Sequence, residues 1–136
     1  MMVSPLCAWS EISSDSVNRS FEHAPPPKYE RKSANPLPDS HAWVNGYWSW
    51  ENNKWAWNKG KYALVTKERP PINNPEFRSL PPSQHHSWIP GNWSEKDGDW
   101  VWTGGHYTQK PFLNAHWKQG RWEYRGIGWI WIPGHW

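Results

Sequence analysis

Residues 88–107 read WIPGNWSEKDGDWVWTGGHY, and this stretch of 20 residues has two further versions in the chain. These are WVNGYWSWENNKWAWNKGKY at 43–62 and WKQGRWEYRGIGWIWIPGHW at 117–136, and all three align without gaps. In each repeat Trp occupies positions 1, 6, 13 and 15, Gly occupies positions 4 and 18, and an aromatic residue occupies position 20. A match of this density predicts a repeat architecture.

The centre of each repeat carries residues that suit a tight turn, namely Asn52-Asn53, Asp97-Gly98 and Gly126-Ile127. Such dipeptides are typical of two-residue type I′ or II′ turns. With the turn placed there, Trp48 faces Trp57 and Trp43 faces Tyr62 across an antiparallel pair of strands. The other repeats give the equivalent pairs Trp93–Trp102, Trp88–Tyr107, Trp122–Trp131 and Trp117–Trp136. We therefore expect each repeat to be a β-hairpin stabilised by cross-strand aromatic pairs.

The glycines of the repeat suggest how one face could become aromatic. Positions 1 and 6 have opposite parity, so a regular strand would direct their tryptophans to opposite faces. A β-bulge with positive φ at the position-4 glycine would return both rings to one face and leave the other face largely polar. An unbulged hairpin with Trp on both faces is the alternative. The glycines expected to have this structural role are Gly46, Gly60, Gly91, Gly105, Gly120 and Gly134.

Composition sets the fold class and the domain limits. The chain has 136 residues and 15 Trp but few aliphatic residues, so we expect an aromatic core. The prediction is an all-β fold of three hairpins with six strands, closed into a small barrel or left as a curled sheet. This repeat domain covers 41–136 and includes a proline-rich linker at 63–87. Residues 1–40 are interpreted as a disordered, proline-rich tether, and 1–10 resemble the remnant of an export signal.

Several classes of function are disfavoured by the sequence. The net charge of +3 is small and the basic residues are scattered, which argues against nucleic-acid binding. No apolar run is long enough for a transmembrane helix, and a single cysteine, Cys7, excludes an internal disulfide. His106 and His135 share one repeat position but have no metal-site context, and the acidic cluster Glu95, Asp97 and Asp99 falls in a predicted turn. We therefore expect a non-enzymatic protein without catalytic residues, cofactor or metal.

The six W-x-x-G-x-[WY] motifs, above all WIPGNW at 88–93 and WIPGHW at 131–136, resemble the YxWGxW-repeat (WxxGxW) proteins of bacteria. The resemblance covers about residues 41–136. It implies a small exported protein of the cell envelope or periplasm, often a lipoprotein or associated with the outer membrane, and it supplies no catalytic residues. The chain departs from that pattern in lacking a clear signal peptide or lipobox.

Two functions remain open for the tryptophans. If they form the core, the chain is a structural or protein-interaction component of the bacterial envelope. If some are exposed, they could bind carbohydrate or peptidoglycan by stacking. Position 8 differs among the repeats (Trp50, Glu95 and Tyr124) and is expected at the rim of the aromatic face. The candidate ligand contacts are Trp50, Tyr124, Trp48, Trp93 and Trp122, the candidate partners are an envelope protein or a cell-wall glycan, and the oligomeric state is left open.

Overall fold

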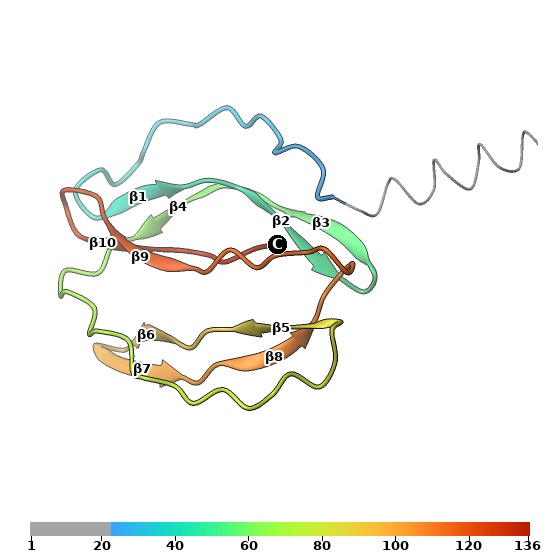
Figure 1. Cartoon of the computed structure of the whole chain (residues 1–136). Coiled ribbons are helices and arrows are strands. Elements are labelled where there is room, and N and C mark those ends of the chain that lie inside the picture. Colours follow the sequence, from blue (N-terminus) through green and yellow to red (C-terminus); the bar gives the residue numbers. More distant parts are fainter. Residues whose placement is uncertain (1–22) are drawn as a thin grey trace, which may run out of the picture.

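The computed structural model describes residues 23–136, which form ten short strands and no helix (Figure 1). Hairpin 1 contains β1 (His41–Val44), β2 (Tyr47–Glu51), β3 (Lys54–Asn58) and β4 (Lys61–Leu64). Hairpin 2 contains β5 (His86–Ile89), β6 (Asn92–Lys96), β7 (Asp99–Thr103) and β8 (His106–Gln109). Hairpin 3 spans 117–136 and contains β9 (Arg121–Tyr124) and β10 (Trp129–Ile132). The predicted all-β class with three antiparallel hairpins is confirmed.

The predicted cross-strand register is also confirmed. Trp43 pairs with Tyr62 and Trp48 with Trp57, and hairpins 2 and 3 repeat this register. An isolated antiparallel bridge between Lys118 and His135 extends it toward the open end of hairpin 3. The turns follow the predicted dipeptides, because positive φ occurs at five of their six residues. These are Asn52 (51°) and Asn53 (60°) in hairpin 1, Asp97 (51°) and Gly98 (85°) in hairpin 2, and Gly126 (84°) in hairpin 3.

The predicted β-bulges are wrong. In hairpin 1, residues 45–46 interrupt one strand directly opposite residues 59–60 in the other, so the pairings Val44–Lys61 and Tyr47–Asn58 stay in register. Among the glycines of residues 23–136, positive φ occurs at Gly98 and Gly126 and not at the position-4 glycines. The break is therefore symmetric, and the six strands predicted for the three hairpins are seen as ten shorter strands.

The repeat glycines are required by indole packing instead. A Cβ built on Gly46 would lie 2.5 Å from Cζ2 of Trp57, and one on Gly91 would lie 2.5 Å from Cζ2 of Trp102. Real Cβ atoms do not approach other atoms so closely, so only glycine leaves room for the ring. The same relation holds at four more positions: Gly60 under Trp43, Gly105 under Trp88, Gly120 under Trp131, and Gly134 under Trp117.

The aromatic rings form a row along each hairpin, which we call its tryptophan ladder. In hairpin 1 the ring centroids of Trp48 and Trp57 are 5.2 Å apart at 65°, an edge-to-face geometry that aromatic pairs favour. The other ladder pairs have centroid separations between 5.0 and 5.6 Å: Trp43–Tyr62, Trp50–Trp55, Trp88–Tyr107, Trp93–Trp102, Trp117–Trp136, Trp122–Trp131 and Tyr124–Trp129.

The hairpins stack on one another, and they form neither a closed barrel nor one curled sheet. All strands belong to separate two-stranded sheets. Hairpin 3 lies between the other two (Figure 1). Thr66, just after β4, forms a bridge with Trp129 of hairpin 3. On the other side, Nε1 of Trp122 donates a hydrogen bond to the carbonyl of Trp93 in hairpin 2, at 2.9 Å.

The closed core is small and aliphatic, contrary to the expected aromatic core. Val44, Val65 and Ile130 are buried, and Val65 also lies against Gly128 of hairpin 3. Every tryptophan from 43 onward is half-buried. An indole is too large to be enclosed by a single two-stranded sheet, so each ladder keeps one side that another segment must cover.

Candidate functional site

A proline-rich segment covers the ladder of hairpin 1. We call residues 26–33 strap 1, which runs outside hairpin 1 in Figure 1. The hairpin donates four hydrogen bonds to it: Trp48 Nε1 to Pro26 O (3.0 Å), Trp57 Nε1 to Glu30 Oε1 (2.6 Å), Gly60 N to Glu30 Oε2 (2.8 Å) and Tyr62 Oη to Ser33 O (2.7 Å). Three rings of the ladder, Trp48, Trp57 and Tyr62, therefore face the same segment, which confirms the single aromatic face predicted for this hairpin.

Hairpin 2 carries an equivalent segment, strap 2, at residues 72–79. Its hydrogen bonds again come from the hairpin: Trp93 Nε1 to Ile72 O (3.1 Å), Gly91 N to Glu76 Oε1 (2.7 Å), Gly105 N to Glu76 Oε2 (2.5 Å) and Tyr107 Oη to Ser79 O (2.6 Å). The two straps thus use carbonyl, glutamate and serine positions with the same spacing. The strap contacts therefore repeat from hairpin 1 to hairpin 2, in addition to the repeat of the hairpins themselves.

A cation completes each set of contacts. Lys32 Nζ lies 5.6 Å from the ring centroid of Trp43 in hairpin 1. The guanidinium of Arg78 lies 5.4 Å from that of Trp88 in hairpin 2. Both cations stand two residues after the strap glutamate, within the range of cation–π attraction.

The direction of the hydrogen bonds follows from the composition of the two partners. An extended chain makes no internal hydrogen bonds, so the strap carbonyls are free to accept from the hairpin, and the strap prolines at 26, 27 and 75 have no N–H to donate. The ladder offers indole N–H groups and the N–H groups of glycines at the strand interruptions. In each strap one glutamate accepts two of these N–H groups, and Glu30 and Glu76 are half-buried. Charge-assisted hydrogen bonds of this kind are the strong ones.

The straps correct the interpretation of the proline-rich segments. The sequence predicts a disordered tether over 1–40 and a linker at 63–87, yet residues 26–33 and 72–79 lie on the ladders. Residues 1–22, including the proposed signal remnant and Cys7, lie outside the described residues. The sequence signal was the pattern E-x-[KR]-S at 30–33 and 76–79, which periodicity and hydrophobicity do not detect.

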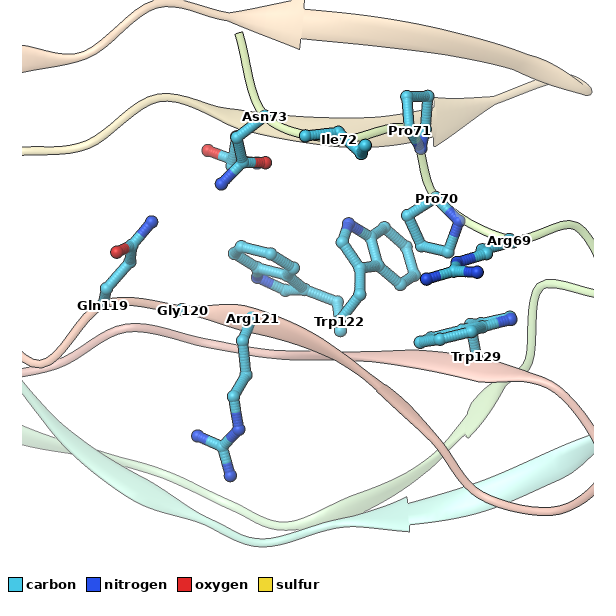
Figure 2. A pocket seen from close by; sticks show the side chains of 12 residues that line it. Arg69, Pro70, Pro71, Ile72, Asn73, Gln119, Gly120, Arg121, Trp122 and Trp129 are labelled. Carbon is cyan, nitrogen blue, oxygen red and sulfur yellow. The ribbon is translucent and has the colours of Figure 1, made fainter. Parts of the chain in front are cut away.

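The ladder of hairpin 3 has different surroundings. The Trp122 indole packs edge-on against Trp100 of hairpin 2, with centroids 5.2 Å apart. Trp100 is available because its cross-strand partner is Glu95, where the other hairpins have an aromatic residue. Beside Trp122 lies a cavity of about 500 Å³. Figure 2 shows it between the ladder of hairpin 3 and the entry of strap 2, and its lining includes Arg69, Pro70, Gly120, Trp122, Trp129 and Trp131.

The candidate ligand contacts are distributed over all three hairpins. Trp48 and Trp93 donate to the straps, whereas Trp122 bonds to hairpin 2. Trp50 packs on Trp55 at 5.0 Å. Tyr124 is 57% exposed. The structure brings Trp93 and Trp122 together, and a ligand role for any of these residues stays a prediction.

Two of the acidic and histidine side chains considered from the sequence, Glu95 and His135, contact backbone groups close to them in the chain. Glu95 accepts a hydrogen bond from Gly98 N at 3.1 Å within the turn, as expected of turn chemistry. His135 Nδ1 lies 3.0 Å from the carbonyl of Trp136. Within residues 23–136, no three His, Cys, Asp or Glu side chains are grouped as a metal would require. The same residues contain no helix long and apolar enough to cross a membrane.

Comparison with known proteins gives one match. The model of the WXXGXW repeat matches residues 41–61, 86–106 and 114–136, which correspond to the three hairpins. No curated protein and no solved structure matches the chain.

Proposed function

We propose that this chain, a WXXGXW-repeat protein, is a non-enzymatic interaction module of the bacterial cell envelope whose tryptophan ladders hold extended, proline-rich segments. The observation that carries the proposal is the repetition of the strap contacts. Two segments of different sequence, 26–33 and 72–79, each place a carbonyl on the indole at repeat position 6, a glutamate on the glycine N–H at position 18, a cation over the indole at position 1 and a second carbonyl on the tyrosine at position 20. The second bond of the glutamate differs, since Glu30 accepts it from Trp57 Nε1 and Glu76 from Gly91 N.

The chemistry of the ladder suits such segments. Extended proline-rich chains lose little conformational entropy on binding and are recognised in aromatic-lined grooves. The indole and glycine N–H groups satisfy strap acceptors, and the rings supply apolar contact area. Each hydrogen bond to the strap carboxylate contributes about 1.5–3 kcal/mol. Specificity therefore centres on the glutamate, and the prolines keep the chain extended.

The carbohydrate alternative rests on one observation. The ring of Tyr124 is 57% exposed and packs on Trp129, which lines the cavity beside hairpin 3. Sugar rings stack on such exposed aromatic pairs. The ladders of hairpins 1 and 2 give less support to this function, because straps cover them.

The strap contact can be tested with Glu30→Gln in the full-length chain. We expect the substitution to release strap 1, so the indole N–H resonance of Trp48, which bonds to Pro26 and not to Glu30, should move toward its solvent-exposed position. The Trp93 indole of hairpin 2 is the internal control and should not move. An excess of a synthetic peptide of residues 24–35 should then restore the Trp48 resonance. If the Trp48 resonance changes neither with the substitution nor with the peptide, the proposal that the ladders hold peptide segments is refuted.

Two further measurements separate the alternatives. Sedimentation with purified peptidoglycan should leave the chain in solution; co-sedimentation that is lost in Trp50→Ala or Tyr124→Ala would favour carbohydrate binding. Fractionation of the source cells should recover the chain with the envelope or periplasm. Recovery in the cytosolic fraction alone would contradict the proposed location.

A further inference from the structure

Hairpin 3 has the glycines and indoles that bind a strap in hairpins 1 and 2, but its own strap is not among the described residues. Its glycines Gly120 and Gly134 lie under the indoles of Trp131 and Trp117, as the equivalent glycines do in hairpins 1 and 2. The nitrogen of each glycine is 2.9 Å from the Cβ position of the other, so the two N–H groups lie close together across the hairpin. Gly91 and Gly105 are the equivalent pair in hairpin 2, and the Glu76 carboxylate bridges their N–H groups.

The chain does not supply hairpin 3 with a strap of its own from the described residues. Only residues 110–116 separate β8 from Trp117, whereas strap 1 begins at Pro26, well before Trp43. Within residues 23–136, no carboxylate accepts a hydrogen bond from Gly120 or Gly134. In hairpins 1 and 2 the indole at repeat position 6 donates to a strap carbonyl. The equivalent indole of hairpin 3, Trp122, donates instead to the carbonyl of Trp93 in hairpin 2.

A cleft leads along the ladder to the two glycines. The cavity of about 500 Å³ beside Trp122 reaches Gly120, and its size is typical of ligand pockets, about 300–1,000 Å³. A smaller cavity of about 50 Å³ shares Gly120, Gln119 and Trp131 with it and continues to Gly134. Neither cavity is lined by an acidic residue, and Arg69 extends over the indoles in Figure 2. The cleft is therefore complementary in charge to a carboxylate.

We propose that this cleft on hairpin 3 binds an extended, proline-rich segment of another polypeptide through a glutamate whose carboxylate bridges the N–H groups of Gly120 and Gly134. The inference rests on the proposed function and names the partner chemistry for one site: a proline-rich stretch followed by E-x-[KR]-S, the pattern shared by both straps. The partner acts in trans, so hairpins 1 and 2 stabilise the module and hairpin 3 recognises the partner.

The test uses the full-length chain and a synthetic peptide, APPPKYERKSAN, identical to residues 24–35. We expect the amide protons of Gly120 and Gly134 to move downfield on titration, as charge-assisted hydrogen bonds form. A peptide with Gln in place of its single Glu should bind about tenfold or more weakly, because it loses at least one hydrogen bond to a charged acceptor. Equal affinity of the two peptides would overturn the carboxylate bridge.

A charge placed in the cleft provides matched variants. Gln119 is exposed and lines both cavities, so Gln119→Glu should repel the peptide carboxylate and weaken binding about tenfold. Gln109→Glu makes the same change at an exposed residue of β8, outside the cleft, and should leave the affinity within about twofold. Equal effects of both variants would mean that the peptide does not use the cleft.

The site of the shifts separates this inference from the proposed function. Shifts confined to the glycines of hairpins 1 and 2 would show strap exchange there, which overturns the inference and preserves peptide holding by the ladders. No shift at any hairpin overturns the inference, and the Glu30→Gln experiment then decides the proposed function independently. Self-association of the chain in ultracentrifugation, abolished by Gln119→Glu, would make a second copy the occupant and also overturn the proposal.

Discussion

Gly104 and Gly105 are neighbours in the chain, and replacing each by alanine should have opposite effects. A Cβ on Gly105 would overlap the Trp88 ring and lie 2.8 Å from the carbonyl of Ile89. A Cβ on Gly104 would meet only Glu76 Oε2, at 3.9 Å, an ordinary contact. Neither glycine has positive φ, so alanine is compatible with the backbone at both positions.

The expected magnitudes follow from these contacts. At Gly105, overpacking costs about 1–3 kcal/mol, and displacement of the Glu76 hydrogen bond costs about 1.5–3 kcal/mol. Restricting the unfolded chain offsets about 0.4–1 kcal/mol. The net destabilisation should be about 2–5 kcal/mol, a large share of the roughly 5–15 kcal/mol available to a domain. Gly104→Ala has only the favourable contribution and should stabilise the fold by about 0.4–1 kcal/mol.

Equilibrium unfolding in urea, followed by tryptophan fluorescence, measures both variants under identical conditions. Near-UV circular dichroism should also report the loss of Trp88–Tyr107 packing in Gly105→Ala alone. If both variants change the free energy of unfolding by less than about 0.5 kcal/mol, the indole does not require glycine beneath it. Packing of rings on glycines would then not explain the repeat.

Three further substitutions test other parts of the fold. Glu76→Gln should lower the free energy of unfolding by about 1.5–3 kcal/mol. Its control is Leu80→Ala, at a side chain 91% exposed just after strap 2, which should change the free energy of unfolding by less than about 0.5 kcal/mol. Similar urea midpoints for the two variants would contradict the strap contact. Ile130→Ala should lower the free energy of unfolding by about 2–5 kcal/mol, measured by thermal unfolding, because Ile130 is 1% exposed and lies on β10, which contacts β1 of hairpin 1. A loss below about 1 kcal/mol would mean that this interface contributes little to stability. Gly98→Ala should cost about 1–2 kcal/mol through backbone strain alone, since φ is +85° and no atom lies within 4 Å of the added Cβ. Gly98→Asn should recover part of this loss, because Asn tolerates the left-handed conformation. An unchanged midpoint for Gly98→Ala would refute the turn geometry.

The hairpins could be predicted from the sequence because their determinants are local. Turn residues such as Asp97-Gly98 fix the register, and the register brings Trp93 opposite Trp102. The role of the glycines was harder to predict. A glycine that provides positive φ and a glycine that makes room for a ring have the same sequence signature, and only the position of the Trp57 indole over Gly46 distinguishes them.

The straps and the stacking order were not predictable by the same reasoning. A strap has no periodic apolar pattern, and its contacts run through carbonyls and one carboxylate, which burial-based arguments ignore. Glu30 and Glu76 gain their role only when a hairpin places two N–H groups beside them. The packing of hairpin 3 between the others depends on a few residues far apart in the chain, such as Thr66 with Trp129.

The straps also have a consequence for the order of folding. The hydrogen bond from Gly60 to Glu30 spans 30 residues, and that from Gly105 to Glu76 spans 29. The bond that joins hairpin 3 to hairpin 1, from Arg125 to Trp43, spans 82 residues, and the bond from Lys67, just after hairpin 1, to Ile127 spans 60. The entropy lost on closing a loop increases with its length, so short closures precede long ones. The bond from Trp122 to Trp93, which joins hairpin 3 to hairpin 2, also spans only 29 residues. We therefore expect the two strap contacts and the contact between hairpins 2 and 3 to form first, and hairpin 3 to dock against hairpin 1 in the last step.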